Sequence, residues 1–226
     1  RTWGDGDPEG VRQRAAEELK TTAVAAARLG AKVVTGFTGS KIWKYVAMFP
    51  PASAEMIAEG YTDFADRFNP IMDVYEANGV KFALEVHPSE IAYDYWTTRA
   101  TLEAIGHREV FGLNFDPSHF VWQGMDYIRP LYEFKDRLFH VHFKDIKMFP
   151  DRLNEVGSLA YPLDYMVPKL PGLGDVNWAK FVSALTDIGY DGYACIEVED
   201  RAFEGSKEKI LESLRVSKKD MEQFGF

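Results

Sequence analysis

The sequence contains a single cysteine, Cys195, among its 226 residues, so no disulfide can form within the chain. A lone cysteine is typical of proteins from a reducing compartment, and we expect a cytoplasmic location. Long apolar runs are also missing, since none approaches the roughly 20 residues that a transmembrane helix needs. We therefore expect no membrane partner.

An excess of basic residues is absent as well. Lys and Arg total 26 against 35 for Asp and Glu, which gives a formal net charge of −9. An acidic surface repels phosphate backbones, so we expect no nucleic acid partner. Neither a G-x-G-x-x-G nor a G-x-x-x-x-G-K-[ST] loop follows any apolar run, and this disfavours a nucleotide-binding fold.

Hydrophobic residues make up 46% of the chain and aromatic residues 14%, enough for a sizeable core. Short apolar runs rich in β-branched and aromatic residues alternate with segments of helical periodicity. Strands are predicted at residues 31–39, 80–87, 110–116, 137–145 and 193–199, and helices at 8–29, 54–79, 93–105, 127–134, 176–190 and 206–224. Residues 146–174, which carry several Pro and Gly, are predicted to be a loop.

The predicted strands are almost continuously apolar, which indicates parallel strands covered on both faces. Alternating strands and helices predict either a closed barrel or an open sheet. A (β/α)8 TIM barrel needs eight units and about 250 residues. We expect residues 1–226 to be a single domain holding the last five units of such a barrel, with about three N-terminal units outside this chain. A complete five-stranded open sheet is the alternative.

Four successive predicted strands end in carboxylates or imidazoles. The chemistry-bearing residues are Glu85, Asp116, His142 and Glu197. The carboxyl ends of barrel strands converge on one mouth, where active sites form. Buried carboxylates need a compensating cation, so the set predicts one divalent metal held by three oxygen donors and one nitrogen. Mn²⁺ is the first expectation, and Co²⁺, Mg²⁺, Fe²⁺ and Zn²⁺ are alternatives.

The fourth predicted strand carries two histidines, His140 and His142. Residues two apart on a strand share a face, and His142 lies nearer the mouth. We expect His142 to be the ligand and His140 to be a packed, hydrogen-bonded residue one layer deeper. Lys144 shares this face and is expected either to reach a substrate oxygen or to lie in solvent at the rim. Asp145 is expected to hold a neighbouring loop or to orient a ligand.

Five motifs, "LEVHP", "NFDPSH", "HVHFKD", "GLGDVNW" and "CIEVED", resemble in their order and spacing the xylose isomerase-like barrels. That superfamily includes sugar isomerases and epimerases, inosose dehydratases and apurinic-site endonucleases, and the resemblance covers residues 31–199. It implies that the four residues above are metal ligands and that Glu85 and Glu197 also serve as catalytic acid and base. It further implies three earlier strands and a homo-oligomer.

The resemblance implies a metal-dependent sugar isomerase or epimerase that transfers a proton through an enediolate between the two glutamates. A lyase or dehydratase acting on an oxidised sugar, a 3-oxo-glycoside or a cyclitol with the same site is an alternative. A non-catalytic barrel subunit is a second alternative. The endonuclease branch is disfavoured because its D-x-H pair is replaced here by Asp175-Val176-Asn177.

Several residues near the predicted strand ends are candidates for binding a small-molecule sugar or sugar derivative. Imidazoles and an ammonium suit sugar hydroxyls, and indole rings stack on sugar faces. Ordinary packing is the alternative reading for the aromatic residues, and a helix-start or supporting role is the alternative for the histidine of "NFDPSH". The candidates are His87, His119, Lys144, Trp43 and Trp122.

Overall fold

The computed structural model describes residues 6–225, which form two compact units that divide between Leu113 and Asn114. The first unit contains α1 (Pro8–Leu29), β1 (Val33–Gly36), the 3-10 turn η1 (Trp43–Tyr45), α2 (Ala54–Ala77), β2 (Lys81–Glu85), α3 (Tyr95–Ala104) and most of β3 (Phe111–Phe115). Within residues 6–225, no helix is both long and apolar enough to cross a membrane.

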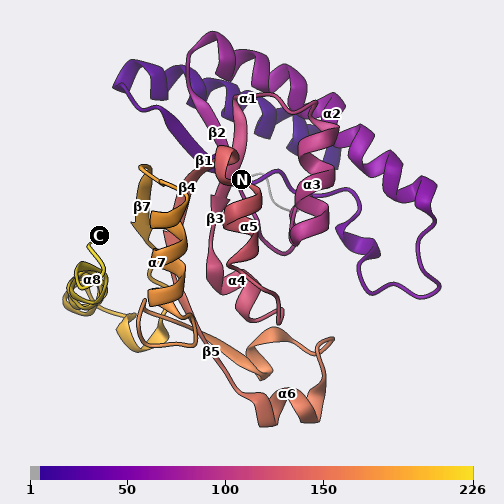
Figure 1. The fold of residues 1–226 in the computed structure, drawn as a ribbon. Helices are drawn as coiled ribbons and strands as arrows, with labels where there is room; N and C mark the ends of the chain where they lie inside the picture. The colour runs from indigo at the N-terminus through magenta and orange to yellow at the C-terminus, as the bar shows by residue number, and fades with distance from the viewer. Residues whose placement is uncertain (1–5, 226) are drawn as a thin grey trace. The chain divides into compact units, whose positions relative to one another are not determined.

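The first helix begins and ends where its capping residues predict. The Asp7 carboxylate accepts a hydrogen bond from the Gly10 backbone N–H at 2.9 Å, and Pro8 occupies the first turn. Gly30 ends the helix in the left-handed conformation with φ of 79°, which a side chain would disfavour. The helix α1 packs against α2, and the two run side by side (Figure 1).

The core of the first unit is built largely from aromatic rings. Phe82 on β2 contacts Phe68 and Tyr75 of α2 and Phe111 of β3, with ring centroids 5.6 to 5.9 Å apart. The strands β1 and β2 pair in parallel. This packing fixes β2 along its length, and the strand ends at Glu85, whose residue surface is 4% exposed.

The second unit completes the element order. It contains α4 (Pro117–Val121), α5 (Arg129–Glu133), the 3-10 turn η2 (Lys135–Arg137), β4 (Leu138–Phe143), β5 (Asp145–Met148), α6 (Pro150–Val156), the 3-10 turn η3 (Pro162–Asp164), β6 (Met166–Lys169), α7 (Trp178–Asp187), β7 (Tyr193–Ile196), the 3-10 turn η4 (Arg201–Phe203) and α8 (Lys207–Glu222). The short helices α4, α5 and α6 each begin with a proline in the first turn, where its missing N–H costs nothing.

The main sheet has the order β1-β2-β3-β4-β7, and the pairs β1–β2 and β4–β7 are parallel. All five predicted strands are confirmed, in sequential order. A run of sequential strands joined through helices is the strand order of a partial (β/α) barrel, which confirms the predicted fold class. The prediction of a single domain stays a prediction.

The prediction of a loop at residues 146–174 was wrong. The strands β5 and β6 form an antiparallel two-stranded sheet, with Asp145 opposite Lys169, and α6 lies between them. Ile146, Tyr165 and Met166 form a small separate core. Each strand has only four residues, so neither produces a periodic pattern long enough to stand out in the sequence.

Candidate metal centre

Parallel pairing of β4 with β7 brings the polar residues of the two strands together. His142 lies opposite Cys195, and the Glu197 backbone N–H donates to the Phe143 carbonyl at 3.1 Å. Lys144 and Glu197 each follow the paired residues by two positions. Because side chains alternate along a strand, these two residues lie on the same face of the sheet as His142.

Asp116 follows β3 directly and begins α4. Its Oδ1 accepts a hydrogen bond from the Ser118 backbone N–H at 2.8 Å, and Pro117 fixes the first turn. Oδ2 is fully buried and accepts no hydrogen bond from any residue in the range 6–225. It lies 3.2 Å from Lys144 Nζ as an ion pair. A buried carboxylate oxygen in this state is ready to bind a cation.

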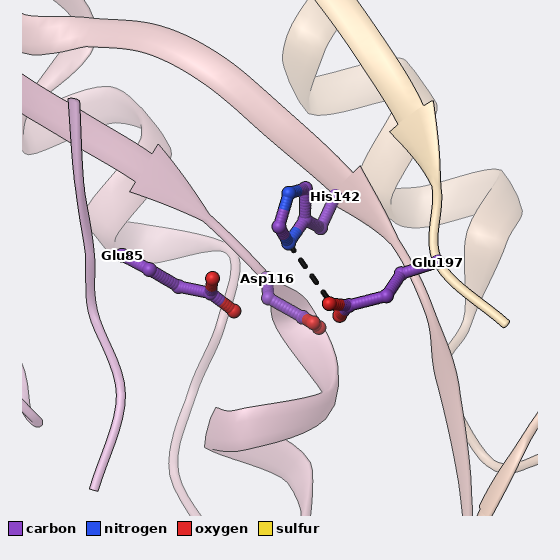
Figure 2. Close-up of side chains that lie close together, drawn as sticks. All are labelled: Glu85, Asp116, His142 and Glu197. Atoms are coloured by element: carbon purple, nitrogen blue, oxygen red, sulfur yellow. Dashed lines mark ion pairs between the residues drawn. The ribbon is translucent and has the colours of Figure 1, made fainter. Parts of the chain in front are cut away.

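Asp116, His142 and Glu197 each present a ligand atom, and these atoms lie within 4.8 Å of one another. Figure 2 shows the His142 ring and the two carboxylates directed toward the same space. His142 Nδ1 is 3.5 Å from Glu197 Oε2, so Nδ1 is the ring nitrogen on the carboxylate side. Glu85, at the end of β2 in the first unit, is the fourth candidate ligand.

Lys144 is the cationic centre of this cluster. Its Nζ lies 2.7 Å from Glu197 Oε2, 3.2 Å from Asp116 Oδ2 and 3.5 Å from Glu199 Oε2, and the residue is 4% exposed. The prediction that allowed a solvent-exposed rim lysine is therefore wrong. Burial lowers the pKa of Lys144, but the charges of the three carboxylates outweigh it and raise the pKa well above its ordinary value.

The same contacts keep Glu197 ionised. Burial would raise the pKa of Glu197, but hydrogen bonding to His142 and the charge and hydrogen bond of Lys144 outweigh it and lower the pKa to about 2. His119, on α4, adds a further polar contact, since its Nε2 lies 3.2 Å from Lys144 Nζ and 3.5 Å from Asp116 Oδ2. The predicted residue His119 therefore lies inside the cluster.

Asn114 is a polar residue of this region that the sequence did not reveal as functional. It lies on β3, two positions before Asp116, and is 0% exposed. Its amide contacts both histidines of β4, with Oδ1 3.0 Å from His140 Nδ1 and Nδ2 3.1 Å from His142 Nε2. A buried Asn on the same strand face as a ligand was the available sequence signal.

Asp145 holds the loop before α7, as one of its two predicted roles required. Its carboxylate accepts hydrogen bonds from the backbone N–H of Ile146, Gly172 and Val176 and from the Trp178 indole, at 2.8 to 3.0 Å. The residue is 0% exposed. The "GLGDVNW" motif is therefore tied directly to the residue that follows Lys144.

The remaining predicted substrate-binding residues are placed differently. Trp43 packs edge-on against Tyr93, with ring centroids 5.2 Å apart, and His87 packs edge-on against Phe37 at 5.7 Å, all within the first unit. Trp122 packs against the small core of the β5–β6 excursion. Packing explains the position of Trp122, and the substrate roles of all three residues stay predictions.

The family model for the xylose isomerase-like TIM barrel matches residues 1–220 of this sequence. The chain belongs to this family. Among curated relatives, it is 31% identical over 167 residues to the uncharacterized protein YfiH of Bacillus subtilis, covering 69% of this chain and 52% of YfiH. It is 26% identical over 145 residues to the inosose dehydratase of Clostridium perfringens, covering 62% and 48%. The chain thus spans about half the length of these relatives.

Solved structures share the fold. The IOLI protein, solved with a bound zinc atom, superposes with a TM-score of 0.67 at 22% identity, covering 96% of this chain and 71% of that one. The 3-keto-D-glucoside 4-epimerase YcjR of E. coli superposes with a TM-score of 0.66 at 18% identity, covering 93% and 73%. At these identities the likeness concerns the fold alone.

Proposed function

We propose that this chain forms the metal-binding part of a sugar isomerase or epimerase that transfers a proton beside a carbonyl group. The observation that carries the proposal is the buried Asp116 Oδ2, which accepts no hydrogen bond from the described residues and lies beside His142 and Glu197. A carboxylate oxygen, an imidazole and a second carboxylate in one polar cluster match the donors of a divalent metal site.

Glu85, Asp116, His142 and Glu197 would hold the ion, with Mn²⁺ as the first expectation. When bound, such an ion polarises a carbonyl and its neighbouring hydroxyl and so stabilises the negative charge of an enediolate. The fit with the protein is good because the ligands supply more negative charge than Lys144 alone neutralises. The zinc in the IOLI protein structure supports a metal in this fold, and Zn²⁺ is therefore among the ions to test.

The side chains of this chain would then divide the proton transfer. Glu197 is held ionised, so it can take the proton from the carbon next to the carbonyl. Glu85 would return a proton, either to the opposite face of the same carbon or to the neighbouring carbon. Lys144, with its ammonium fixed among Asp116, Glu197 and Glu199, would donate a hydrogen bond to a substrate oxygen. His119 supports the Lys144 ammonium.

A dehydratase is the second candidate, and the relation to inosose dehydratase favours it. In this reaction the same base removes the proton, and a hydroxyl on the β carbon leaves as water after receiving a proton from the second glutamate. The carbon skeleton thereby gains a double bond and loses one water. The two candidates share every residue named above and differ only in the fate of the enediolate.

The reaction in D₂O distinguishes these candidates. The protein containing this chain is loaded with Mn²⁺ and incubated with ketoses, oxidised sugars and cyclitol ketones. Deuterium in the recovered sugar supports an isomerase or epimerase, and loss of water supports a dehydratase. Glu85→Gln and Glu197→Gln should each abolish turnover, while Glu155→Gln, a surface change on α6, should retain it. Full turnover in both site variants would overturn the acid and base roles.

The length of the relatives supports a proposal about the whole protein. We infer that about three further βα units complete the barrel, since an eight-unit barrel is roughly 100 residues longer than five units. A homo-oligomer of such barrels and a sugar as the small-molecule partner are parts of the same proposal, and neither nucleic acid nor a membrane is included. Light scattering of the complete protein tests the oligomer.

A further inference from the structure

The contacts among His140, Asn114 and His142 form a chain that runs from the deeper layer of the second unit to the metal centre. His140 and His142 lie on the same face of β4, with ring centroids 5.4 Å apart and planes at 90°. Asn114 reaches both rings from β3. All three residues are at least partly buried, and Asn114 is fully buried. A buried amide between two imidazoles constrains which nitrogen of each ring carries a proton.

The proton positions follow from the amide orientation. Asn114 Oδ1 accepts, so His140 Nδ1 must carry a hydrogen across the 3.0 Å contact. Asn114 Nδ2 donates, so the His142 nitrogen that it faces must carry a lone pair. Nε2 is the nearer one at 3.1 Å, against 3.3 Å for Nδ1. A neutral His142 then carries its hydrogen on Nδ1, which is the nitrogen facing Glu197.

Metal binding requires the opposite arrangement on His142. The nitrogen on the carboxylate side is Nδ1, and a metal ligand must offer a lone pair. The hydrogen must then sit on Nε2 and needs an acceptor. A half-turn of the Asn114 amide places Oδ1 at nearly the position of Nδ2 and supplies that acceptor. His140 Nδ1 then accepts from Nδ2, and its hydrogen moves to its own Nε2, so neither ring gains or loses a proton overall.

We propose that Asn114 is an amide switch that selects the tautomer of His142: its nitrogen faces His142 in the metal-free protein, and its oxygen faces His142 when the metal is bound. This inference rests on the metal site proposed above. Asn114 and His140 are positioning residues in this scheme, since they act on the ligand and not on the metal. The loss of such a partner typically weakens metal affinity about 10- to 100-fold.

The tautomers can be measured directly by long-range ¹H–¹⁵N correlation spectra of the imidazole rings. The chain has five histidines, and a His142→Gln sample identifies the signals of His142. Diamagnetic Zn²⁺ is the probe for the loaded state. In the metal-free protein we expect the hydrogen on His142 Nδ1, and after addition of Zn²⁺ we expect it on Nε2.

Two variants test the role of the amide. Asn114→Asp offers only acceptors, so the metal-free variant should already show the hydrogen on His142 Nε2. His140→Phe removes the partner of Oδ1, so His142 should show a mixture of both tautomers and Zn²⁺ affinity should fall about 10-fold or more. Asn177→Asp, at the exposed N-cap of α7, is the matched control and should leave the His142 signals unchanged.

The outcomes separate the two proposals. Hydrogen on His142 Nε2 in the metal-free wild type overturns the switch, as does an unchanged tautomer in a folded Asn114→Asp. The His140→Phe spectra decide the question if Asn114→Asp fails to fold, and a single unchanged tautomer there overturns it. If Zn²⁺ moves no histidine signal although the metal-free spectra agree, the metal site is wrong and the switch goes with it, while tautomer selection by Asn114 in the metal-free protein stands.

Discussion

Lys144 Nζ lies 2.7 Å from Glu197 Oε2, and this contact joins the two strands that carry most of the candidate metal site. Both residues occupy the same face at the carboxyl ends of paired strands β4 and β7. The contact means that the site holds an internal cation next to two candidate metal ligands. A metal ion and the lysine must share the charge of Asp116 and Glu197, and this competition has measurable consequences.

Replacing Lys144 by Met should destabilise the metal-free protein by roughly 3 kcal/mol, because removal of one partner leaves buried carboxylates uncompensated. Saturating Mn²⁺ should then stabilise the variant by more than it stabilises the wild type. Urea unfolding with and without Mn²⁺ measures both effects. Lys147→Met is the control, since its pair with Asp175 is largely exposed and is worth less than about 1 kcal/mol. Equal losses in the two variants would contradict the central role of Lys144.

Replacing Asp145 by Asn should cost about 2 to 3 kcal/mol of unfolding free energy. An amide nitrogen would face N–H donors that the carboxylate now accepts, which leaves buried groups unsatisfied. Trp178, one of the four donors, reports the change through its fluorescence. Asp175→Asn lies in the same loop but is more exposed, and it should cost clearly less. A normal Trp178 spectrum and wild-type stability in Asp145→Asn would show that the loop does not depend on this residue.

Glu90 gives a prediction about pH that does not involve the metal. It is 5% exposed and accepts hydrogen bonds from the Thr38 and Gly39 backbone N–H groups. Burial raises its pKa above 4.5 although those hydrogen bonds lower it. The folded state therefore holds this proton more tightly than the unfolded chain, so protonation favours folding. This stabilisation is fully present below the unfolded value of 4.5 and is lost as the pH rises through the folded pKa.

Glu90→Gln removes this titration. The stability of the wild type relative to Glu90→Gln should therefore increase as the pH falls from neutral toward 4.5. Urea unfolding of both proteins across this range measures the difference. Glu59→Gln, an exposed position on α2, corrects for the loss of one surface charge. A difference that is flat, or that shrinks as the pH falls, would show that burial does not govern Glu90.

The sequence predicted the elements whose patterns are long and repetitive. Helix α1 followed from Asp7, Pro8 and Gly30, and the five sheet strands followed from apolar runs. The four-residue strands β5 and β6 were missed because so few residues show no periodicity, and Pro168 in β6 disguised it further. Tertiary contacts make that hairpin, through its own core of Ile146, Tyr165 and Met166.

The candidate site shows the same division. Asp116, His142 and Glu197 were predicted together because carboxyl ends of parallel strands meet at one edge, and the structure brings them together. The burial of Lys144 was not predictable, since it depends on three carboxylates from two other segments. The role of Asn114 was missed for a related reason, because its partners come from a neighbouring strand and leave no pattern around residue 114.

The most direct test of a metal centre at these residues is metal content per chain after equilibrium dialysis against Mn²⁺, Co²⁺, Mg²⁺, Fe²⁺ or Zn²⁺. We predict about one equivalent in the wild type, a near-complete loss in Asp116→Ala and His142→Ala, and full retention in Asp126→Ala, where the exposed carboxylate only caps a turn. Equal metal content in all four proteins, or no metal in the wild type with any ion, would contradict the proposed centre.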